Sequence, residues 1–189
     1  MARTADPNRR ADILQAARET FQERGYTRAR IADVAARAGV APGTIYLYFA
    51  SKEAMVLALA EQFFANMADA TLPKIDQPDS MAAINDAVHA GLTYAAQERD
   101  LLKFTFLDAG FNATKPAPAQ LAFRDELAHH LSRRMDEGTW RRYDPAILSD
   151  LIIGMMVRAV EAGVLQNHDL KRYEQTITAL LCHTLLPHA

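Results

Sequence analysis

The stretch that decides the fold spans residues 31–49 and reads IADVAARAGVAPGTIYLYF. Its first half carries a short apolar helical face that stops at Gly39, and Pro42 is suited to the first turn of a second helix. Ile45 and Phe49 then lie one turn apart on that second helix. Two short helices joined by a three- or four-residue turn that contains glycine predict a helix-turn-helix unit.

The second helix of this unit has an unusual outer face. We expect Gly39 to leave the first helix with a positive φ, and Val40, Ile45 and Phe49 to point inward. The residues that remain outside include two tyrosines and a leucine but no charge; they are Pro42, Gly43, Thr44, Tyr46, Leu47 and Tyr48. Methyl groups and hydroxyls on an exposed helix are typical of side chains that meet base edges in the major groove of DNA.

The residues in and around this unit resemble those of a known family. The pair Gly25-Tyr26, the blocks 31–40 and 43–49, and the triplet 51–53 (Ser-Lys-Glu) closely resemble the TetR family of transcriptional regulators. The match covers about residues 9–55, whereas the acidic remainder resembles the family only in length and helicity. The resemblance implies a DNA-binding regulator, usually a repressor that a ligand releases from a palindromic operator.

The resemblance also implies which residues read the DNA. Thr44, Tyr46 and Leu47 match recognition-helix positions that touch bases or the backbone beside them. Pro42 and Gly43 match the start of the recognition helix, where the backbone approaches the edge of the groove. These five residues form the predicted base-reading part of the site.

The remaining predicted contacts go to phosphates. Tyr48 and Lys52 match phosphate-contacting positions, and Lys52 lies in the first turn of the next helix, where backbone N–H groups help to hold a phosphate. Arg30 takes a position that often bears a phosphate-binding Ser or Thr, and Ala41 replaces the usual Ser or Thr cap, at a cost of roughly 0.5–2 kcal/mol. The alternatives are that the two tyrosines are core aromatics and that the two cations are ordinary solvated side chains.

The rest of the chain also predicts helices, and no segment shows the two-residue alternation of a strand. The fold class is therefore all-α, with about nine helices. The other helices are expected at 7–24, 52–70, 81–98, 101–111, 119–137, 146–165 and 170–185. Pro73 and Pro78 indicate a loop, and 112–118 is another. We expect an N-terminal three-helix helix-turn-helix domain over residues 1–52 and a helical ligand-sensing and dimerisation domain over residues 53–189.

Two of the predicted helices are candidates for a dimer interface. Residues 146–165 are apolar nearly all round, so we expect this helix to be buried on more than one side. The helix at 170–185 offers a partner surface, and TetR-like proteins form homodimers through their last two helices. A dimer also presents two recognition helices about 34–36 Å apart, as a palindrome requires. The alternative is a helix at the centre of a monomer core.

A small-molecule site is expected in the C-terminal domain. Ligand pockets are mostly apolar and contain a few convergent polar groups. Such side chains occur on the long fourth helix and in the middle of the chain; the candidates are Phe63, Phe64, Met67, Tyr94, Phe104, Leu107, Asp108 and Phe111. They favour a small hydrophobic or aromatic effector, and the alternative is that the aromatics are packed core.

The charge of the chain is unevenly distributed. Residues 1–52 hold nine Lys and Arg against five Asp and Glu, a net +4, and the remainder holds 12 against 18, a net −6. A basic N-terminal part on an otherwise acidic chain favours a polyanionic partner for residues 1–52. No apolar run approaches the roughly 20 residues of a membrane-spanning helix, and the N-terminus does not have the pattern of a secretory signal. We therefore expect a cytoplasmic protein.

The sequence disfavours an enzyme. His129 and His130 are adjacent and point about 100° apart on a helix, so they do not easily share one metal ion. The other histidines lack metal-ligand or catalytic spacing, and no glycine-rich phosphate loop or nucleophile elbow is present. Cys182 is the single cysteine and lies on an apolar helix, as buried thiols do. We expect no enzymatic activity, metal or cofactor; the remaining alternative is an adaptor whose head binds protein.

Overall fold

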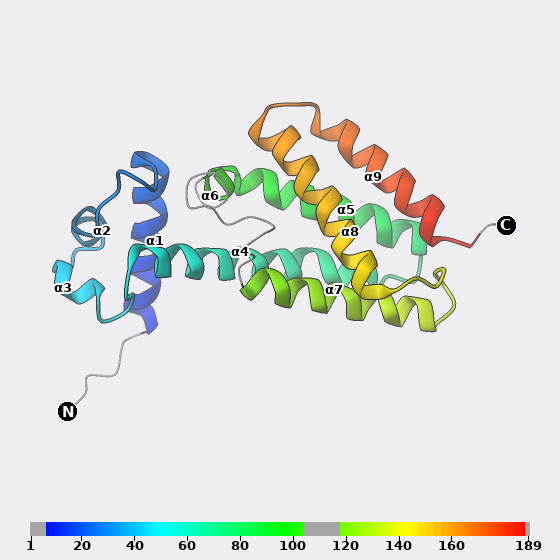
Figure 1. Ribbon diagram of the computed structural model, residues 1–189, viewed down its shortest axis with the longest axis horizontal. Coiled ribbons are helices and arrows are strands. Elements are labelled where there is room, and N and C mark those ends of the chain that lie inside the picture. Colours follow the sequence, from blue (N-terminus) through cyan, green and yellow to red (C-terminus); the bar gives the residue numbers. More distant parts are fainter. Residues whose placement is uncertain (1–6, 104–117, 188–189) are drawn as a thin grey trace. The chain divides into compact units, whose positions relative to one another are not determined.

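The computed structural model describes residues 7–103 and 118–187, and all regular structure in these ranges is helical, which confirms the all-α class. The helices are α1 (Pro7–Arg24), α2 (Ile31–Arg37), α3 (Pro42–Ile45), α4 (Lys52–Ile75), α5 (Ser80–Gln97), α6 (Arg99–Leu102), α7 (Pro118–Asp136), α8 (Pro145–Ala159), a π-helical segment (Val160–Leu165) and α9 (Leu170–Leu185) (Figure 1).

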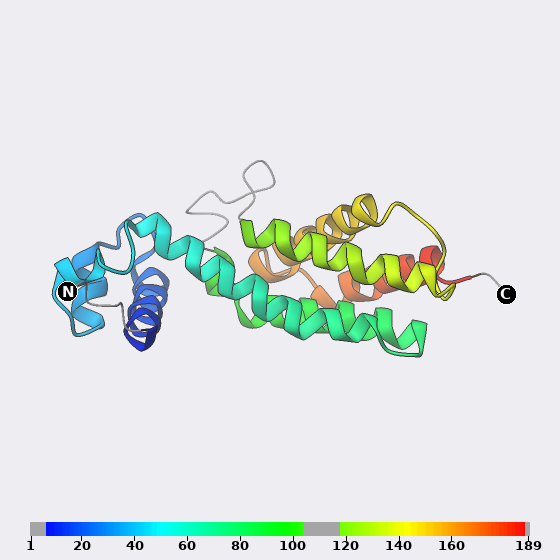
Figure 2. The same ribbon diagram turned by 90° about the horizontal axis from the view of Figure 1, so that it is seen from below.

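The described helices divide into two compact units. Residues 7–62 and 100–103 belong to the first unit, and residues 63–99 and 118–187 belong to the second. Helix α4 therefore begins in the first unit and ends in the second, and its whole length can be followed in Figure 2. The functional domain boundary after residue 52 stays a prediction, because a unit defined by compactness is not by itself a functional domain.

The first unit is built around a small apolar core. Helix α1 packs on α2, and α2 packs on α3. The buried apolar side chains recur at helical spacing along α1 and continue through α2, α3 and the start of α4; they include Ile13, Leu14, Phe21, Val34, Ala35, Ile45, Phe49, Met55 and Leu59. Positive φ angles of 75° at Gly25 and 65° at Gly39 end α1 and α2, as the glycine positions predict.

The recognition helix is shorter than predicted. It was expected to continue to Phe49, but α3 is α-helical only to Ile45. The chain then continues as a turn in which the backbone N–H groups of Tyr48 and Phe49 donate to the Ile45 carbonyl at 3.0 and 2.9 Å. These bonds still carry Phe49 inward, where it is buried.

Helix α4 is longer than predicted. It runs to Ile75 instead of ending near residue 70, so Pro73 lies in its last turn and not in the expected loop. Proline is compatible with this place because its fixed φ is helical, although it removes one backbone hydrogen bond. Leu72 and Ile75 are both buried beside it, and their burial compensates for that missing bond.

The second unit has a larger core formed by α5, α7, α8, α9 and the end of α4. Helix α7 packs on α8, and α5 packs on α9. The core side chains are Leu72, Ile75, Ala83, Ile84, Val88, Leu92, Leu127, Leu131, Met135, Trp140, Leu148, Ala159, Ile177, Leu181 and Leu185. Asp79 caps the start of α5 by accepting bonds from two backbone amides, and Asp144 caps the start of α8 in the same way.

Two expected helices differ from the prediction or lie partly outside the described residues. The helix predicted over 146–165 is α-helical to Ala159 and continues as the π-helical segment Val160–Leu165. Of the helix predicted over 101–111, the structure describes only the start, as the end of the short α6. The candidate effector residues Phe104, Leu107, Asp108 and Phe111 lie outside the described residues.

Candidate functional site

The outer face of α3 and the turn that follows it is exposed and carries no charged side chain. Tyr46 is 57% exposed and Leu47 is 74% exposed, whereas Ile45 between Thr44 and Tyr46 is fully buried. Pro42 and Gly43 are exposed, and Thr44 and Tyr48 are half-buried. The interpretation of Tyr46 as a core aromatic is therefore wrong, and the face has the exposure that a DNA-reading surface requires.

A tight turn fixes the start of this face. The amide of Val40 donates to the Ala35 carbonyl at 3.0 Å, and the amide of Gly39 donates to the Ala36 carbonyl at 3.3 Å, which is the bonding of a Schellman motif. Ala41 supplies no side-chain cap to α3, and Pro42 occupies its first turn, as the sequence predicts. Val40 is only half-buried, so it points inward less completely than expected.

Arg30 lies at the N-terminal end of α2. Its backbone N–H donates to the Asp33 carboxylate at 3.0 Å, and its side chain is exposed. Asp33 also forms an ion pair with Arg24 of α1 at 3.6 Å. Helix α2 is thus fixed by its own first turn and by α1, while Arg30 remains exposed.

Some of the basic residues of the first unit serve the fold. Arg37 of α2 donates to Glu19 of α1 at 3.0 Å and forms a second ion pair with Glu23. The pKa of Glu19 lies below its usual value, because its carboxylate accepts hydrogen bonds from Gln15 and from Arg37. The positive balance of the N-terminal residues therefore overstates the number of cations that face a partner.

Lys52 takes an unexpected direction. It is the first residue of α4 and is half-buried. Its ammonium group lies against the backbone of residues 26–29, the loop between α1 and α2, where it donates hydrogen bonds to carbonyl groups. The predicted phosphate contact at Lys52 competes with these internal bonds.

A second set of predicted residues meets in the second unit. The rings of Phe63 and Phe64 on α4 lie 5.2 Å apart, and Phe63 lies 5.3 Å from Tyr94 on α5. Phe64 also contacts Phe123 of α7, with ring centroids 6.1 Å apart. The structure therefore brings together three of the predicted effector residues and adds Phe123, whose only sequence signal was that it is an aromatic residue on a predicted helix.

A buried glycine extends this apolar region. A Cβ atom placed on Gly91 of α5 would lie 3.0 Å from the Met156 Cε, 3.4 Å from the Thr71 Cγ2 and 3.8 Å from the Met67 Sδ. Met67 was a predicted effector residue, whereas Gly91 and Met156 were not. Methionine side chains are flexible and repack easily, so the space over Gly91 is filled by adaptable groups.

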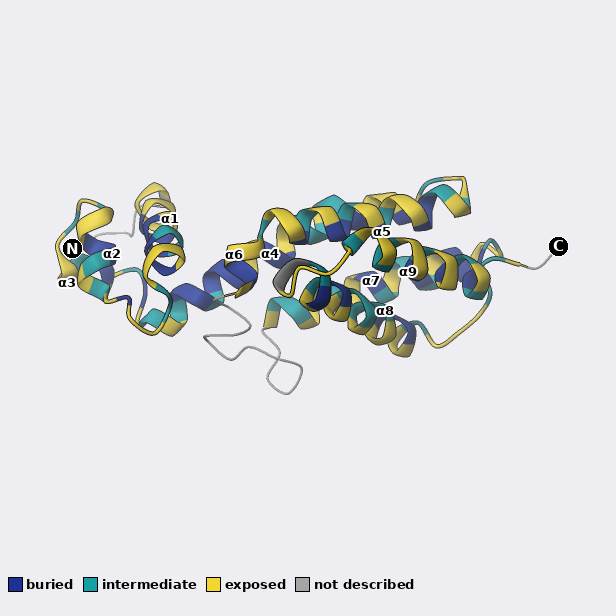
Figure 3. Cartoon of the chain, turned by 90° about the horizontal axis from the view of Figure 1, so that it is seen from above, coloured by how far each residue is buried: buried dark blue, intermediate teal, exposed yellow. Residues whose placement is uncertain are grey.

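Large apolar side chains are exposed on α8 and α9. Ile147 is 59% exposed, Leu151 61%, Val157 38% and Leu180 53%. Ile147 and Leu151 are four residues apart and so lie on the same side of α8. Figure 3 shows exposed residues along both helices. In a single chain, α8 is therefore not buried all round.

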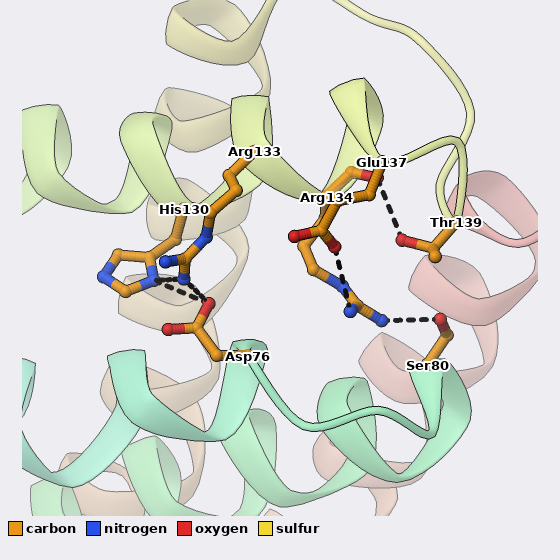
Figure 4. Close-up of polar contacts among 7 residues, drawn as sticks. All are labelled: Asp76, Ser80, His130, Arg133, Arg134, Glu137 and Thr139. Atoms are coloured by element: carbon orange, nitrogen blue, oxygen red, sulfur yellow. Dashed lines mark hydrogen bonds and ion pairs between the residues drawn. The ribbon is translucent and has the colours of Figure 1, made fainter.

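Polar contacts join Asp76, which directly follows α4, to α7, and join α7 to α5. Asp76 accepts a bond from His130 Nδ1 at 3.0 Å and forms an ion pair with Arg133 (Figure 4). Burial raises the pKa of Asp76, but the hydrogen bonds and charges of these two partners lower it by more, to below its usual value. Arg134, which is 4% exposed, donates to the Ser80 hydroxyl at 2.7 Å (Figure 4).

Within residues 7–103 and 118–187, no group of three or more His, Cys, Asp or Glu side chains is arranged to hold a metal ion. None of the helices described there combines the length and apolarity that crossing a membrane requires. Cys182 is half-buried, and desolvation raises the pKa of its thiol.

Comparisons with known proteins agree with this geometry. Residues 13–59 match the family model for bacterial regulatory proteins of the tetR family. YvdT of Bacillus subtilis, an uncharacterised helix-turn-helix-type transcriptional regulator, is 47% identical over 57 residues, which are 30% of this chain and 29% of YvdT. The sequence similarity to that relative thus covers less than a third of its length.

Solved structures show the same fold over nearly the whole chain. The fatty acid degradation regulator FadR from Bacillus halodurans has a TM-score of 0.78 at 24% identity, over 95% of this chain and 96% of that chain. FadR from Bacillus subtilis, solved in complex with stearoyl-CoA, has a TM-score of 0.73 at 23% identity, over 90% and 96%.

The fold and the exposed α3 face define a helix-turn-helix protein with an all-helical body. Residues 13–59 are thus similar to the tetR family of bacterial regulatory proteins, and the chain shares its overall fold with solved regulators such as FadR from Bacillus halodurans.

Proposed function

We propose that this protein is a homodimeric repressor that binds a palindromic operator and is released from it by a small apolar effector. The observation that carries the proposal is the exposure of Tyr46 and Leu47 in the turn that follows buried Ile45. Large exposed side chains on a helix-turn-helix are suited to contacts with base edges and thymine methyl groups. The proposed DNA contacts are Arg30, Pro42, Gly43, Thr44, Tyr46, Leu47 and Tyr48. A DNA target of this kind implies action in the cytoplasm.

The decisive experiment measures binding to duplex DNA selected from a random pool by the wild-type protein. Tyr46→Ala and Leu47→Ala should each weaken binding by roughly 1–3 kcal/mol for the contact removed. Met81→Ala is the matched control, because Met81 is 55% exposed but belongs to α5 in the second unit. Wild-type affinity should fall steeply as salt rises. Failure of folded wild-type protein to select any duplex would refute DNA binding and favour the protein-binding adaptor.

The homodimer is proposed from the exposed apolar residues of α8 and α9. Contiguous exposed apolar surface on a soluble protein is typical of an interaction site, and family members dimerise through their last two helices. Leu151→Arg places a charge at the centre of the proposed interface and should give a monomer in sedimentation measurements. Leu121→Arg, at a residue that is 39% exposed on α7, should leave the dimer intact.

The effector is proposed to be hydrophobic, bound by Phe63, Phe64, Met67 and Tyr94 together with the predicted residues beyond Leu102. Aromatic rings in edge and tilted contact and flexible methionines match the apolar lining of a small-molecule site. Since the fold is shared with a regulator solved with stearoyl-CoA, a long-chain acyl thioester is the first probe to use. Stearoyl-CoA should lower operator affinity, and coenzyme A alone should not.

Effector and DNA are proposed to compete through the conformation of α4. Suppose that the effector prefers a conformation that cannot bind DNA. It then lowers the affinity for DNA by some factor, and bound DNA must lower the affinity for the effector by the same factor. A coupling of roughly 1–3 kcal/mol is typical. Equal effector affinity for free and DNA-bound protein would contradict release by the effector.

A further inference from the structure

The ammonium group of Lys52 lies among three backbone carbonyl groups. Its Nζ donates to the carbonyl oxygens of Tyr26 at 2.7 Å, Ala29 at 3.2 Å and Thr27 at 3.4 Å. A lysine ammonium has three N–H donors, so the loop engages all of them. A phosphate at this position would have to displace at least one of these bonds.

Tyr26 completes the arrangement around Lys52. The Nζ atom lies 4.3 Å from the centroid of the Tyr26 ring, within the range of a cation–π contact. The Tyr26 hydroxyl donates to the Glu53 carboxylate at 2.9 Å, and the Tyr26 ring makes an edge contact with Phe21 at 5.6 Å. Two successive residues of α4 therefore hold the same loop.

The held loop leads directly into the DNA-reading unit. Ala29, whose carbonyl accepts one of the bonds, is buried, and the next residue is Arg30, which precedes the first turn of α2. Helix α2 packs against α3. A displacement of residues 26–29 would therefore move the support of the exposed α3 face.

We propose that Lys52 is a positioning residue, which fastens the α1–α2 loop to the first turn of α4 and so fixes the placement of α2 and α3, and that it does not bind a DNA phosphate. This inference rests on the DNA binding proposed above. It assigns to the first turn of α4 the task of holding the DNA-reading helices in place, so a movement of that turn would be passed to the loop.

The first test compares Lys52→Met with Lys74→Met, a change of the same type at an exposed lysine in the last turn of α4. The readout is the slope of log affinity against log salt for the selected duplex, at a temperature where circular dichroism shows each variant folded. We expect Lys52→Met to lose roughly tenfold in affinity with an unchanged slope, and Lys74→Met to match the wild type. A lost phosphate contact would make the slope shallower by about 0.9, and this outcome would overturn the proposal.

The second test separates the geometry of the ammonium from its charge. Lys52→Arg keeps the charge, but a planar guanidinium does not reproduce the compact group that fits between three carbonyls. We expect Lys52→Arg to lose affinity as Lys52→Met does, again with an unchanged slope. Wild-type affinity in folded Lys52→Arg would overturn the proposal, since a phosphate contact tolerates that exchange.

The third test addresses a purely structural role. If Lys52 only stabilised the fold, Lys52→Met would lower the urea midpoint and leave the operator affinity of the folded protein unchanged, which would also overturn the proposal. Tyr26→Phe retains the ring and removes the bond to Glu53, so it should weaken DNA binding in the same direction but less. A wild-type protein that selects no duplex would instead refute the proposed DNA binding itself.

Discussion

The proposed site residues of the two units differ in their exposure to solvent. In the first unit, most of the residues proposed to read DNA are exposed, such as Leu47, which lies two residues after the buried Ile45. In the second unit, the proposed effector residues Phe63 and Phe64 are themselves buried. A DNA-reading surface can thus be changed with little effect on stability, whereas an effector site of this kind shares its residues with the core.

The largest effect should come from a pair of substitutions within the first unit. Ile45 is fully buried, so Ile45→Ala should lower the free energy of unfolding by about 2–5 kcal/mol, as large-to-small changes in cores do. Leu47 is 74% exposed, so Leu47→Ala should change it by less than about 0.5 kcal/mol and act on DNA affinity instead. Urea unfolding monitored by circular dichroism measures both free energies. If the two variants lost similar amounts of stability, Leu47 would belong to the core and not to the contact surface.

A buried polar contact should give the next largest effect, in the second unit. Ser80→Ala removes the acceptor of the 2.7 Å bond from Arg134, whose side chain is nearly inaccessible. Hydrogen bonds to charged groups contribute roughly 1.5–3 kcal/mol, so unfolding should become easier by about that amount. Ser80→Thr keeps the hydroxyl and serves as the control in the same urea titration. Equal stability of wild type and Ser80→Ala would show that water replaces the hydroxyl.

Some features of the fold could be predicted from the sequence and others could not, and the difference has a physical reason. Gly39 and Pro42 determine local backbone geometry, so the turn, its positive φ and the outward face of Tyr46 were predictable without tertiary information. The end of α4 was not, because the helix continues through Pro73 only where tertiary packing buries Leu72 and Ile75.

The same limit applies to the sites. The sequence indicated Phe63 and Tyr94 as candidates for the effector site, but no local pattern relates Gly91 to Met156, because the pairing of α5 with α8 exists only in the fold. Lys52 shows that a correctly placed residue can still have an unpredicted side-chain direction. Its place at the start of α4 was correctly predicted, while the direction of its side chain depends on a loop that lies more than 20 residues away in the chain.

Two glycines of the helix-turn-helix should separate backbone strain from DNA contact. Gly39 has a φ of 65°, so Gly39→Ala should destabilise the fold by roughly 1–2 kcal/mol even though the added methyl would meet nothing. Gly43 has no positive φ and faces open space, so Gly43→Ala should stabilise the fold by about 0.4–1 kcal/mol. Gly43→Ala should nevertheless weaken operator binding, because its methyl group stands on the proposed DNA face. Unchanged affinity in a more stable Gly43→Ala protein would remove that position from the interface.

The smallest effect should appear as a pH dependence of the second unit. The pKa of Asp76 lies below its usual value, because the bonds from Arg133 and His130 outweigh burial. A carboxyl group with a depressed folded-state pKa stabilises the fold above its unfolded-state pKa, near 3.9, and this stabilisation is lost as the pH falls through the folded-state pKa. Asp76→Asn should therefore cost up to about 1 kcal/mol at pH 7, since the contact is partly solvated, and should converge with the wild type below about pH 4. Urea midpoints of both proteins between pH 3 and 7 measure the difference; a gap that stays constant down to pH 3 would show that Asp76 contributes by packing and not by its charge.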